Sequence, residues 1–326
     1  MRPASVFTKL KIRNPRRHAG VTLIELVVVI TITGIIAAVM GKMIVQPILG
    51  FQATARRAEL VDAAEMAMRQ TARDIRQALP NSVRVDPTGR AIEMLSTLDG
   101  ARYRAKPGTA AGGHPHPPSS PQYRLQIPGT DINGFNIVGF FRNITIPPGG
   151  WVSSAQTPPA RLAIYNQGNV AADAYADGDE STAVPASYVI TRPGQTSFTI
   201  DDDGGGDEHN VAPGVGQNFK FRWDSPFHRV FIVGTPITYI CDPVAGTITR
   251  YWNYPIRTAQ PTNPAAAPLT AGVNALLTRP VTACVFKYTA GTNTRAGIIT
   301  LDITVRDNDS GEQVRLLHQA HVDNSP

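Results

Sequence analysis

The sequence predicts an α+β protein in which a long N-terminal helix crosses a membrane and then packs on the antiparallel β-sheet of a head domain. Three observations support this fold class. Residues 21–40 form an apolar run long enough to span a bilayer as a helix, and residues 51–79 carry apolar side chains at helical spacing. Beyond residue 80, short alternating runs are separated by glycines and prolines, which is typical of strands and turns.

The formal net charge of +6 is concentrated before the apolar run. Six of the 31 Lys and Arg residues, and no acid, lie in residues 1–20, so the other 25 bases balance the 25 acids. Nucleic-acid binding is therefore disfavoured, because it requires a concentrated basic face. By the positive-inside rule, the basic leader predicts that residues 1–20 stay cytoplasmic and that the chain beyond about residue 45 is translocated.

The boundary between the leader and the apolar run has an unusual order. A secretory signal is cleaved after its apolar region. Here Gly20 precedes the apolar run, so cleavage after Gly20 would leave the whole hydrophobic helix on the mature protein, anchored in the lipid bilayer.

The second half of the predicted helix is amphipathic. One stripe recurs at intervals of three and four residues through Leu60, Ala64, Ala67/Met68, Thr71, Ile75 and Leu79. We expect a kink at Pro47 and the end of the helix at Pro80-Asn81.

The head is predicted to be rich in β-strands. Candidate strands in its first half are AIEML, YRLQI, RLAIYN, ASYVIT, TSFTID and NFKFRW. Those in its second half are RVFIV, ITYIC, TITRYWNYPI, TACVFKYT, AGIITLDITVRD and EQVRLLHQAHV, several of them joined by hairpin turns. In the run 297–306 apolar and polar residues alternate, which indicates a sheet with one wet face and one face laid over the helix 51–79.

The chain has two cysteines, Cys241 and Cys284, which form either one disulfide or two buried thiols. Export to an oxidising compartment favours the disulfide. A disulfide between Cys241 and Cys284 would close a loop of about 40 residues and would stabilise the fold by roughly 3–4 kcal/mol on the chain-entropy model.

Glu25 lies five residues into the apolar run, where a charged group is costly unless it is paired or functional. Cleavage after Gly20 would create an α-amine on Val21, one helical turn away. The carboxylate can pair with that amine in its own chain or, in a staggered assembly, with the amine of a neighbour. The second arrangement would set the axial register.

The stretch GVTLIEL, with its basic leader and the apolar run, resembles the N-terminus of the type IV pilin and pseudopilin family. The resemblance implies cleavage after Gly20 by a prepilin peptidase, N-methylation of Val21 and an assembly role for Glu25. Val21 departs from the usual Phe, and Lys42 lies near where many major pilins have a helix-kinking proline. No cofactor is implied.

The family also implies a type IV pilin-like fold with four parts. These are a cytoplasmic leader (1–20), a membrane and assembly half of the helix (21–50), an amphipathic half (51–80) and a periplasmic or extracellular head (81–326). The partners implied are other minor and major pilins and the inner-membrane pilus assembly platform. The protein would first span the bacterial inner membrane and later lie in a surface pilus.

Parts of the head resemble the minor pilins of the mannose-sensitive haemagglutinin (MSHA) pilus, relatives of the J-type pseudopilins: YRAK, the Cys241 segment to RYWNYPI, CVFKY and the segment from residue 311. Residues 106–218 contribute little to this resemblance. It implies a role in initiating the pilus, near its tip. Two alternatives remain open: a type II secretion pseudopilin, and a membrane-anchored adhesion module that binds through the loops 106–122 and 201–210.

Other candidate sites are weaker. The acidic loop with Asp201, Asp203 and Asp207 suggests calcium, but it lacks the spacing of an EF-hand, so a solvated loop is the preferred interpretation. The aromatic residues 251–254 are interpreted as core in preference to a binding surface. The sequence contains no recognisable catalytic motif, so we do not expect an enzyme.

Overall fold

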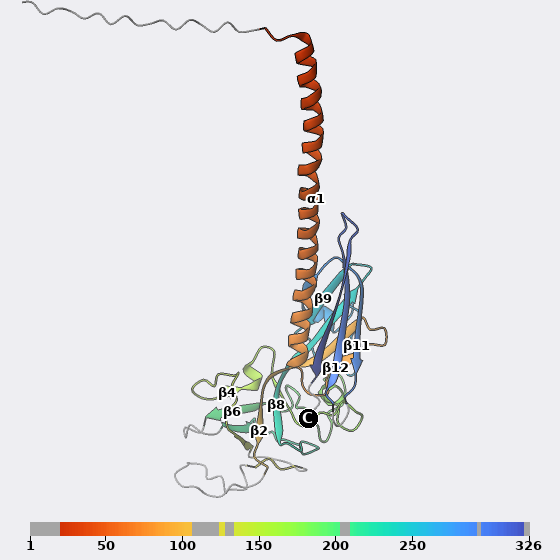
Figure 1. Cartoon of the computed structure of the whole chain (residues 1–326). Coiled ribbons are helices and arrows are strands. Elements are labelled where there is room, and N and C mark those ends of the chain that lie inside the picture. The colour runs from red at the N-terminus through yellow and green to blue at the C-terminus, as the bar shows by residue number, and fades with distance from the viewer. Residues whose placement is uncertain (1–19, 106–123, 128–133, 203–208, 292–294, 323–326) are drawn as a thin grey trace, which may run out of the picture. The chain divides into compact units, whose positions relative to one another are not determined.

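The helix α1 (Leu23–Arg76) runs through 54 residues of the computed structural model, which describes residues 20–105, 124–127, 134–202, 209–291 and 295–322 (Figure 1). The chain divides into two compact units, Met1–Arg56 and Arg57–Pro326. The helix ends three residues before the predicted boundary. Pro47 lies inside it without ending it, and the kink expected there stays a prediction.

The part of α1 from Arg57 onward has one buried face. Its buried side chains are Ala64, Ala67, Met68, Thr71, Ala72, Asp74 and Ile75, and Leu60 is partly buried. The predicted amphipathic stripe is therefore confirmed, with an aspartate added to it. After the helix the chain turns at Pro80 and at Asn81, which has a φ of 60°.

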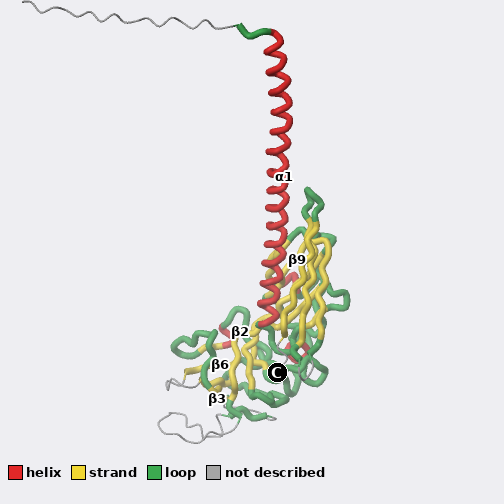
Figure 2. Tube along the Cα trace, viewed as in Figure 1, coloured by secondary structure: helices red, strands yellow, loops and turns green. Residues whose placement is uncertain are grey.

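The larger sheet has ten antiparallel strands in the described part of the chain (Figure 2). Its main path is β10-β9-β8-β2-β3-β7-β6-β4, with β1 beside β2 and β5 beside β8. The strands are β1 (Arg84–Val85), β2 (Ala91–Tyr103), β3 (Phe135–Val138), β4 (Trp151–Val152), β5 (Arg161–Ala163), β6 (Phe198–Asp202), β7 (His209–Pro213), β8 (Arg229–Asp242), β9 (Thr247–Trp252) and β10 (Val273–Thr278).

The smaller sheet contains β11 (Val281–Thr289), β12 (Gly297–Arg306) and β13 (Gln313–Val322), also antiparallel. Its central strand β12 alternates as predicted. Ile299, Leu301, Ile303 and Val305 are all buried, whereas the residues between them are partly exposed. These buried side chains share one core cluster with Ala64, Met68, Ala72 and Ile75 of α1. The expected packing of this sheet on the helix is confirmed.

A second core cluster fills the other end of the larger sheet and is rich in aromatic residues. Phe135 and Phe219 lie 5.7 Å apart between ring centroids, and Phe198 lies at the same distance from Trp151. The α+β fold class, with a long N-terminal helix and an antiparallel β-sheet head, is confirmed in the described residues.

Several strand boundaries differ from the prediction. RVFIV and ITYIC are one strand, β8, which passes through Pro236 at an irregularity in its pairing with β2, a place where proline is tolerated. Short strands β1, β3, β4, β7 and β10 were missed. The described part of YRLQI, residues 124–127, contains no strand.

The runs ASYVIT and NFKFRW were wrongly predicted as strands. The two runs pair with each other through one isolated bridge, between Tyr188 and Phe221. Backbone hydrogen bonds accompany this bridge, since the N–H of Tyr188 donates to the carbonyl oxygen of Lys220 at 3.0 Å and the N–H of Arg222 donates to that of Tyr188 at 2.9 Å. Arg222 donates to the carbonyl oxygen of Ser187 at 2.7 Å, and Arg192 donates to that of Thr182 at 3.0 Å.

Candidate functional site

The start of α1 is set by a threonine cap. The backbone N–H of Glu25 donates to Thr22 Oγ1 at 3.3 Å, and the N–H of Leu26 donates to the Thr22 carbonyl oxygen at 3.1 Å. Thr22 is therefore the N-cap and Glu25 occupies the third helical position, as in a capping box. Val21 directly precedes the cap. Cleavage after Gly20 would place the new α-amine near the positive end of the helix dipole. The Glu25 carboxylate lies in this first turn, where the positive amine and the dipole both favour a negative charge.

The first unit presents apolar side chains in every direction around the helix. The large apolar residues from Leu23 to Phe51 are 46–82% exposed. A helix that is apolar on all sides belongs in lipid or among other apolar helices. The hydroxyl of Thr31 donates to the carbonyl oxygen of Val28 at 2.9 Å, and that of Thr33 donates to Val29, so these polar groups are satisfied without water.

Two charged side chains, Glu25 and Lys42, lie within this apolar segment. Between Glu25 and Arg56 the sequence has one charged residue, Lys42. Residues 21–41 would extend about 31 Å as a helix, close to the thickness of a hydrocarbon core. Lys42 can then reach the far interface with its ammonium group. Among the described residues, α1 is the one helix long and apolar enough to cross a membrane.

Residues 15–41 match the family described as the prokaryotic N-terminal methylation motif. The chain carries a type IV pilin N-methylation motif. Together with the α+β fold, this motif supports a type IV pilin-like or pseudopilin protein that is anchored in a membrane by its N-terminal helix. The motif implies processing by a prepilin peptidase and assembly with other pilins, and it indicates a structural, non-enzymatic protein. No curated protein and no solved structure matched the chain.

The N-methylation motif brings three predicted site residues together at the beginning of the helix: Gly20, Val21 and Glu25. They are exposed, and a Cβ at Gly20 would meet nothing within 4 Å in the described structure. The use of these three residues in cleavage, methylation and assembly stays a prediction.

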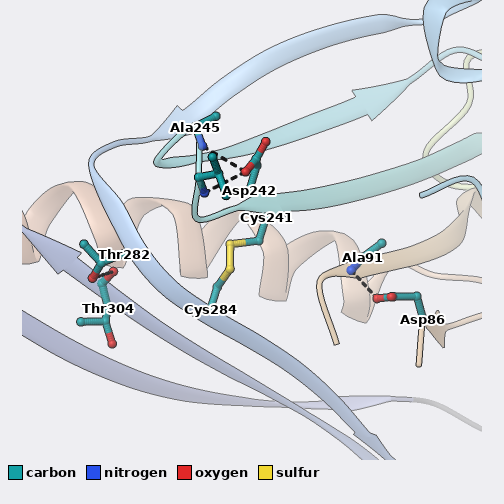
Figure 3. The surroundings of a disulfide bond; sticks show 9 residues. Asp86, Ala91, Cys241, Asp242, Ala245, Thr282, Cys284 and Thr304 are labelled. Atoms are coloured by element: carbon teal, nitrogen blue, oxygen red, sulfur yellow. Dashed lines mark hydrogen bonds between the residues drawn. A yellow bond between two sulfur atoms is a disulfide. The ribbon is translucent and has the colours of Figure 1, made fainter. Parts of the chain in front are cut away.

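The disulfide Cys241–Cys284 is present and joins the two sheets (Figure 3). Cys241 lies near the end of β8 and Cys284 within β11, with their Cα atoms 6.4 Å apart. Both are buried in the core cluster that also contains the helix residues. Asp242 caps the following turn by accepting from the N–H of Val244 at 2.9 Å and of Ala245 at 3.0 Å.

The calcium hypothesis gains no support from the described residues. Asp201 lies in β6, which pairs with β7, while Asp203 and Asp207 lie outside the residues that the structure describes. No group of three or more potential metal ligands occurs within the described ranges. The aromatic residues 251–254 were predicted to be core: Tyr251 and Tyr254 are buried in a core cluster, and Trp252 is only partly buried.

An aspartate that the sequence reasoning missed fastens the helix to the larger sheet. Asp74 is buried, and its Oδ2 accepts from the Tyr239 hydroxyl at 2.5 Å and from Arg250 Nε at 2.7 Å. Gln70 donates to the other carboxylate oxygen at 3.1 Å. Burial and the Asp74 carboxylate raise the pKa of Tyr239, so this phenol stays protonated and donates. The sequence did contain one signal for this buried contact, namely an acidic residue between Thr71 and Ile75 on the predicted apolar stripe.

A second buried carboxylate, Glu93, lies in β2. Arg84 Nε donates to the Glu93 carboxylate at 2.7 Å, and the Tyr254 hydroxyl donates to the same carboxylate at 3.0 Å. The Arg84 guanidinium also stacks on Tyr175, 3.5 Å from its ring centroid. Burial raises the pKa of Glu93 to about 7, although Arg84 and Tyr254 act in the opposite direction. The pair holds β1 to β2, and the pKa of Glu93 lies near neutrality.

Proposed function

We propose that this protein is a minor pilin that acts in the initiation and biogenesis of a type IV pilus of the MSHA type, near the pilus tip. The observation that carries the proposal is the N-methylation motif followed directly by a capped, membrane-length helix and a β-sheet head. The assignment to the MSHA system, with MshO as the minor pilin it resembles, rests on the sequence resemblance of the head segments.

In this proposal, residues 1–20 form a cytoplasmic leader that a prepilin peptidase removes after Gly20. Residues 21–50 hold the protein in the bacterial inner membrane and later enter the pilus, residues 51–80 form the amphipathic half of the helix, and residues 81–326 form the periplasmic head. The order of charges supports this orientation, since the basic leader precedes the apolar run.

Assembly would use the carboxylate of Glu25. Its position in the first helical turn, beside the future amine of Val21, supports pairing with the amine of a neighbouring subunit displaced along the fibre. A subunit that retains Glu25 is competent to lie beneath another subunit. We therefore place the protein near the tip and not at its extreme end. Detection of this protein as the terminal subunit would contradict the placement.

Two alternatives share the motif. A type II secretion pseudopilin would use the same processing and helix packing to build a short periplasmic fibre. A membrane-anchored adhesion module would bind through the loops 106–122 and 201–210, most of which lie outside the described residues. Deletion of these loops separates the adhesin from the initiator, because an adhesin would then assemble normally and lose attachment.

The test is the processing and assembly of Gly20→Ala and Glu25→Ala in the native cell, with Glu25→Gln as the isosteric neutral variant. We expect Gly20→Ala to remain uncleaved on an immunoblot. We expect both Glu25 variants to be cleaved and to lose surface fibres, because they lack the charge. Normal fibres containing uncleaved protein would overturn the proposal and favour the adhesion module.

A further inference from the structure

The loop between β9 and β10, residues 253–272, lines a cleft in the head. The structure describes this loop completely, and its one regular element is the short 3-10 helix Leu269–Ala271. Ordered loops of this length are uncommon in compact domains and are usually functional. The cleft has a volume of about 520 Å³, within the range of ligand sites, and it is partly open to solvent. Asp179 and Ser181, which follow the short helix α2 (Ala174–Gly178), complete its lining.

The wall of this cleft is fastened to the body of the head. Arg84 donates to the carbonyl oxygen of Thr258 at 2.6 Å and to that of Arg257 at 2.9 Å. Arg84 is itself held by the buried carboxylate of Glu93. The backbone N–H of Thr258 donates to Asp179 at 2.8 Å. The cleft is therefore preformed, which lowers the entropic cost of binding a ligand there.

The cleft offers one guanidinium with unused donors. Among the described lining residues, Arg257 is the one base and Asp179 the one acid. The Asp179 carboxylate already accepts from the Ser181 hydroxyl at 2.6 Å and from the Ser181 N–H at 2.9 Å. Arg257 Nη1 lies 3.4 Å from Asp179 and donates to the carbonyl oxygen of Ile256 at 3.0 Å. Nε and Nη2 of Arg257 form no hydrogen bond within the described residues, and this pair of donors fits the two oxygens of a carboxylate.

The rest of the lining indicates what carries that carboxylate. No aromatic side chain lines the cleft in the described structure, so it lacks the platform on which nucleobases stack. A phosphate monoester carries nearly two negative charges, whereas the cleft has one base beside one acid. Prolines and alanines provide apolar surface, and the polar groups of Gln260, Thr262 and Asn263 can pair with peptide N–H and C=O groups. The open side lets a chain enter and leave.

We propose that this cleft binds an extended peptide segment of another protein through an aspartate or glutamate side chain, which Arg257 receives. Apolar neighbours of the acid contact the prolines and alanines of the cleft. In the proposed function the peptide belongs to another subunit of the fibre. The cleft itself does not depend on that function, because it uses none of Gly20, Val21 and Glu25.

The proposal is tested by nuclear magnetic resonance of the full chain in detergent micelles, with its arginines labelled with nitrogen-15. The probe is a mixture of blocked pentapeptides with Asp at the centre and Ala, Ser, Val and Pro at the other positions. The matched mixture has Asn at the centre. We expect the acidic mixture to shift the Nε–H signal of Arg257 saturably and to leave that of Arg102, which is exposed outside the cleft, in place. The signal is assigned by its loss in Arg257→Gln.

Three outcomes of this titration would overturn the proposal. No saturable shift with the acidic mixture at millimolar concentration would mean that the cleft binds no such peptide. Equal shifts of Arg257 and Arg102 would mean that carboxylates meet exposed arginines without a site. Equal binding of the Asn mixture would mean that the carboxylate is not recognised.

A variant that fills the cleft separates the site from the charge. Ala259 is exposed and lines the cleft, so Ala259→Trp occupies its space and keeps Arg257. We expect the shift of the Arg257 signal to be lost in this variant. The matched control Ala283→Trp, at an exposed position of β11, should titrate like the wild type. An unchanged shift in Ala259→Trp would overturn the proposal, because the peptide would then bind outside the cleft.

The outcome is separable from that of the proposed function. Normal leader cleavage and normal fibres in a protein whose Arg257 signal does not respond would refute the peptide cleft alone. A saturable response in a protein that forms fibres without cleavage after Gly20 would refute the proposed function and leave the cleft intact.

Discussion

Opening the Cys241–Cys284 bond is expected to destabilise the head by about 4 kcal/mol. The two cysteines are 43 residues apart, and the chain-entropy relation gives a loss of roughly 13 cal/mol/K for a loop of that length, or about 4 kcal/mol at 298 K. Both side chains are buried in the cluster shared by the helix and the two sheets, so reduction leaves the packing atoms in place. The effect therefore isolates the covalent link.

The assay is denaturant unfolding of the full chain in detergent micelles, followed by near-ultraviolet circular dichroism with and without reductant. The variant Cys241→Ala/Cys284→Ala is the control, and its unfolding should not respond to the reductant. It should also be less stable than the reduced wild type, because it loses two buried sulfur atoms. A loss below about 1 kcal/mol on reduction would refute the loop-entropy reasoning, since it would mean that the unfolded chain keeps the two segments together.

Three further substitutions probe the head. Burial makes the ionised form of Glu93 unfavourable in the folded protein. The stability that protonated Glu93 contributes is therefore fully present below its unfolded pKa of 4.5, and it is lost as the pH rises through its folded pKa of about 7, an effect of about 3 kcal/mol. Glu93→Gln should flatten the fall in unfolding free energy by that amount, and an unchanged pH profile would contradict this. Asp74→Asn leaves Arg250 without its carboxylate partner and should lower the free energy of unfolding by about 2–3 kcal/mol. The exposed control Asp62→Asn should change it by less than about 0.5 kcal/mol. Equal effects of the two substitutions would refute the role assigned to Asp74. Gly89→Ala should cost about 1–2 kcal/mol in the same unfolding assay, because Gly89 has a φ of 69° and its Cβ would lie 3.0 Å from the carbonyl oxygen of Phe286; wild-type stability would contradict that reasoning.

The N-terminal part of the molecule could be predicted from the sequence because its signals are local. The hydrophobic length and the stripe of α1 are both encoded within a few turns of helix. The alternation in β12 is equally local and predicted its buried face. The disulfide could be favoured because the chain has two cysteines and an export signal, although nothing local specified that it joins two different sheets.

The first half of the head could not be predicted in the same way. The segments around Tyr188 and Phe221 alternate like strands, yet they meet through one isolated bridge and a few long-range hydrogen bonds from backbone and arginine groups. Such bonds join residues tens of positions apart, and no periodicity records them. The role of Asp74 was hidden for the same reason, because its partners on β8 and β9 are 165 and 176 residues away.

The shared core of α1, β12 and β13 has a consequence for the timing of folding. The cluster joins Ala64 and Met68, near the beginning of the second unit, to Ala320 and Val322, near the end of its last described strand. Contacts of such long sequence separation form late and slowly. While the last strand is still missing, the buried face of the helix has no cover from it. A chain that is still being synthesised or exported therefore cannot complete this core, and the head reaches its final state only after nearly all of its residues have emerged.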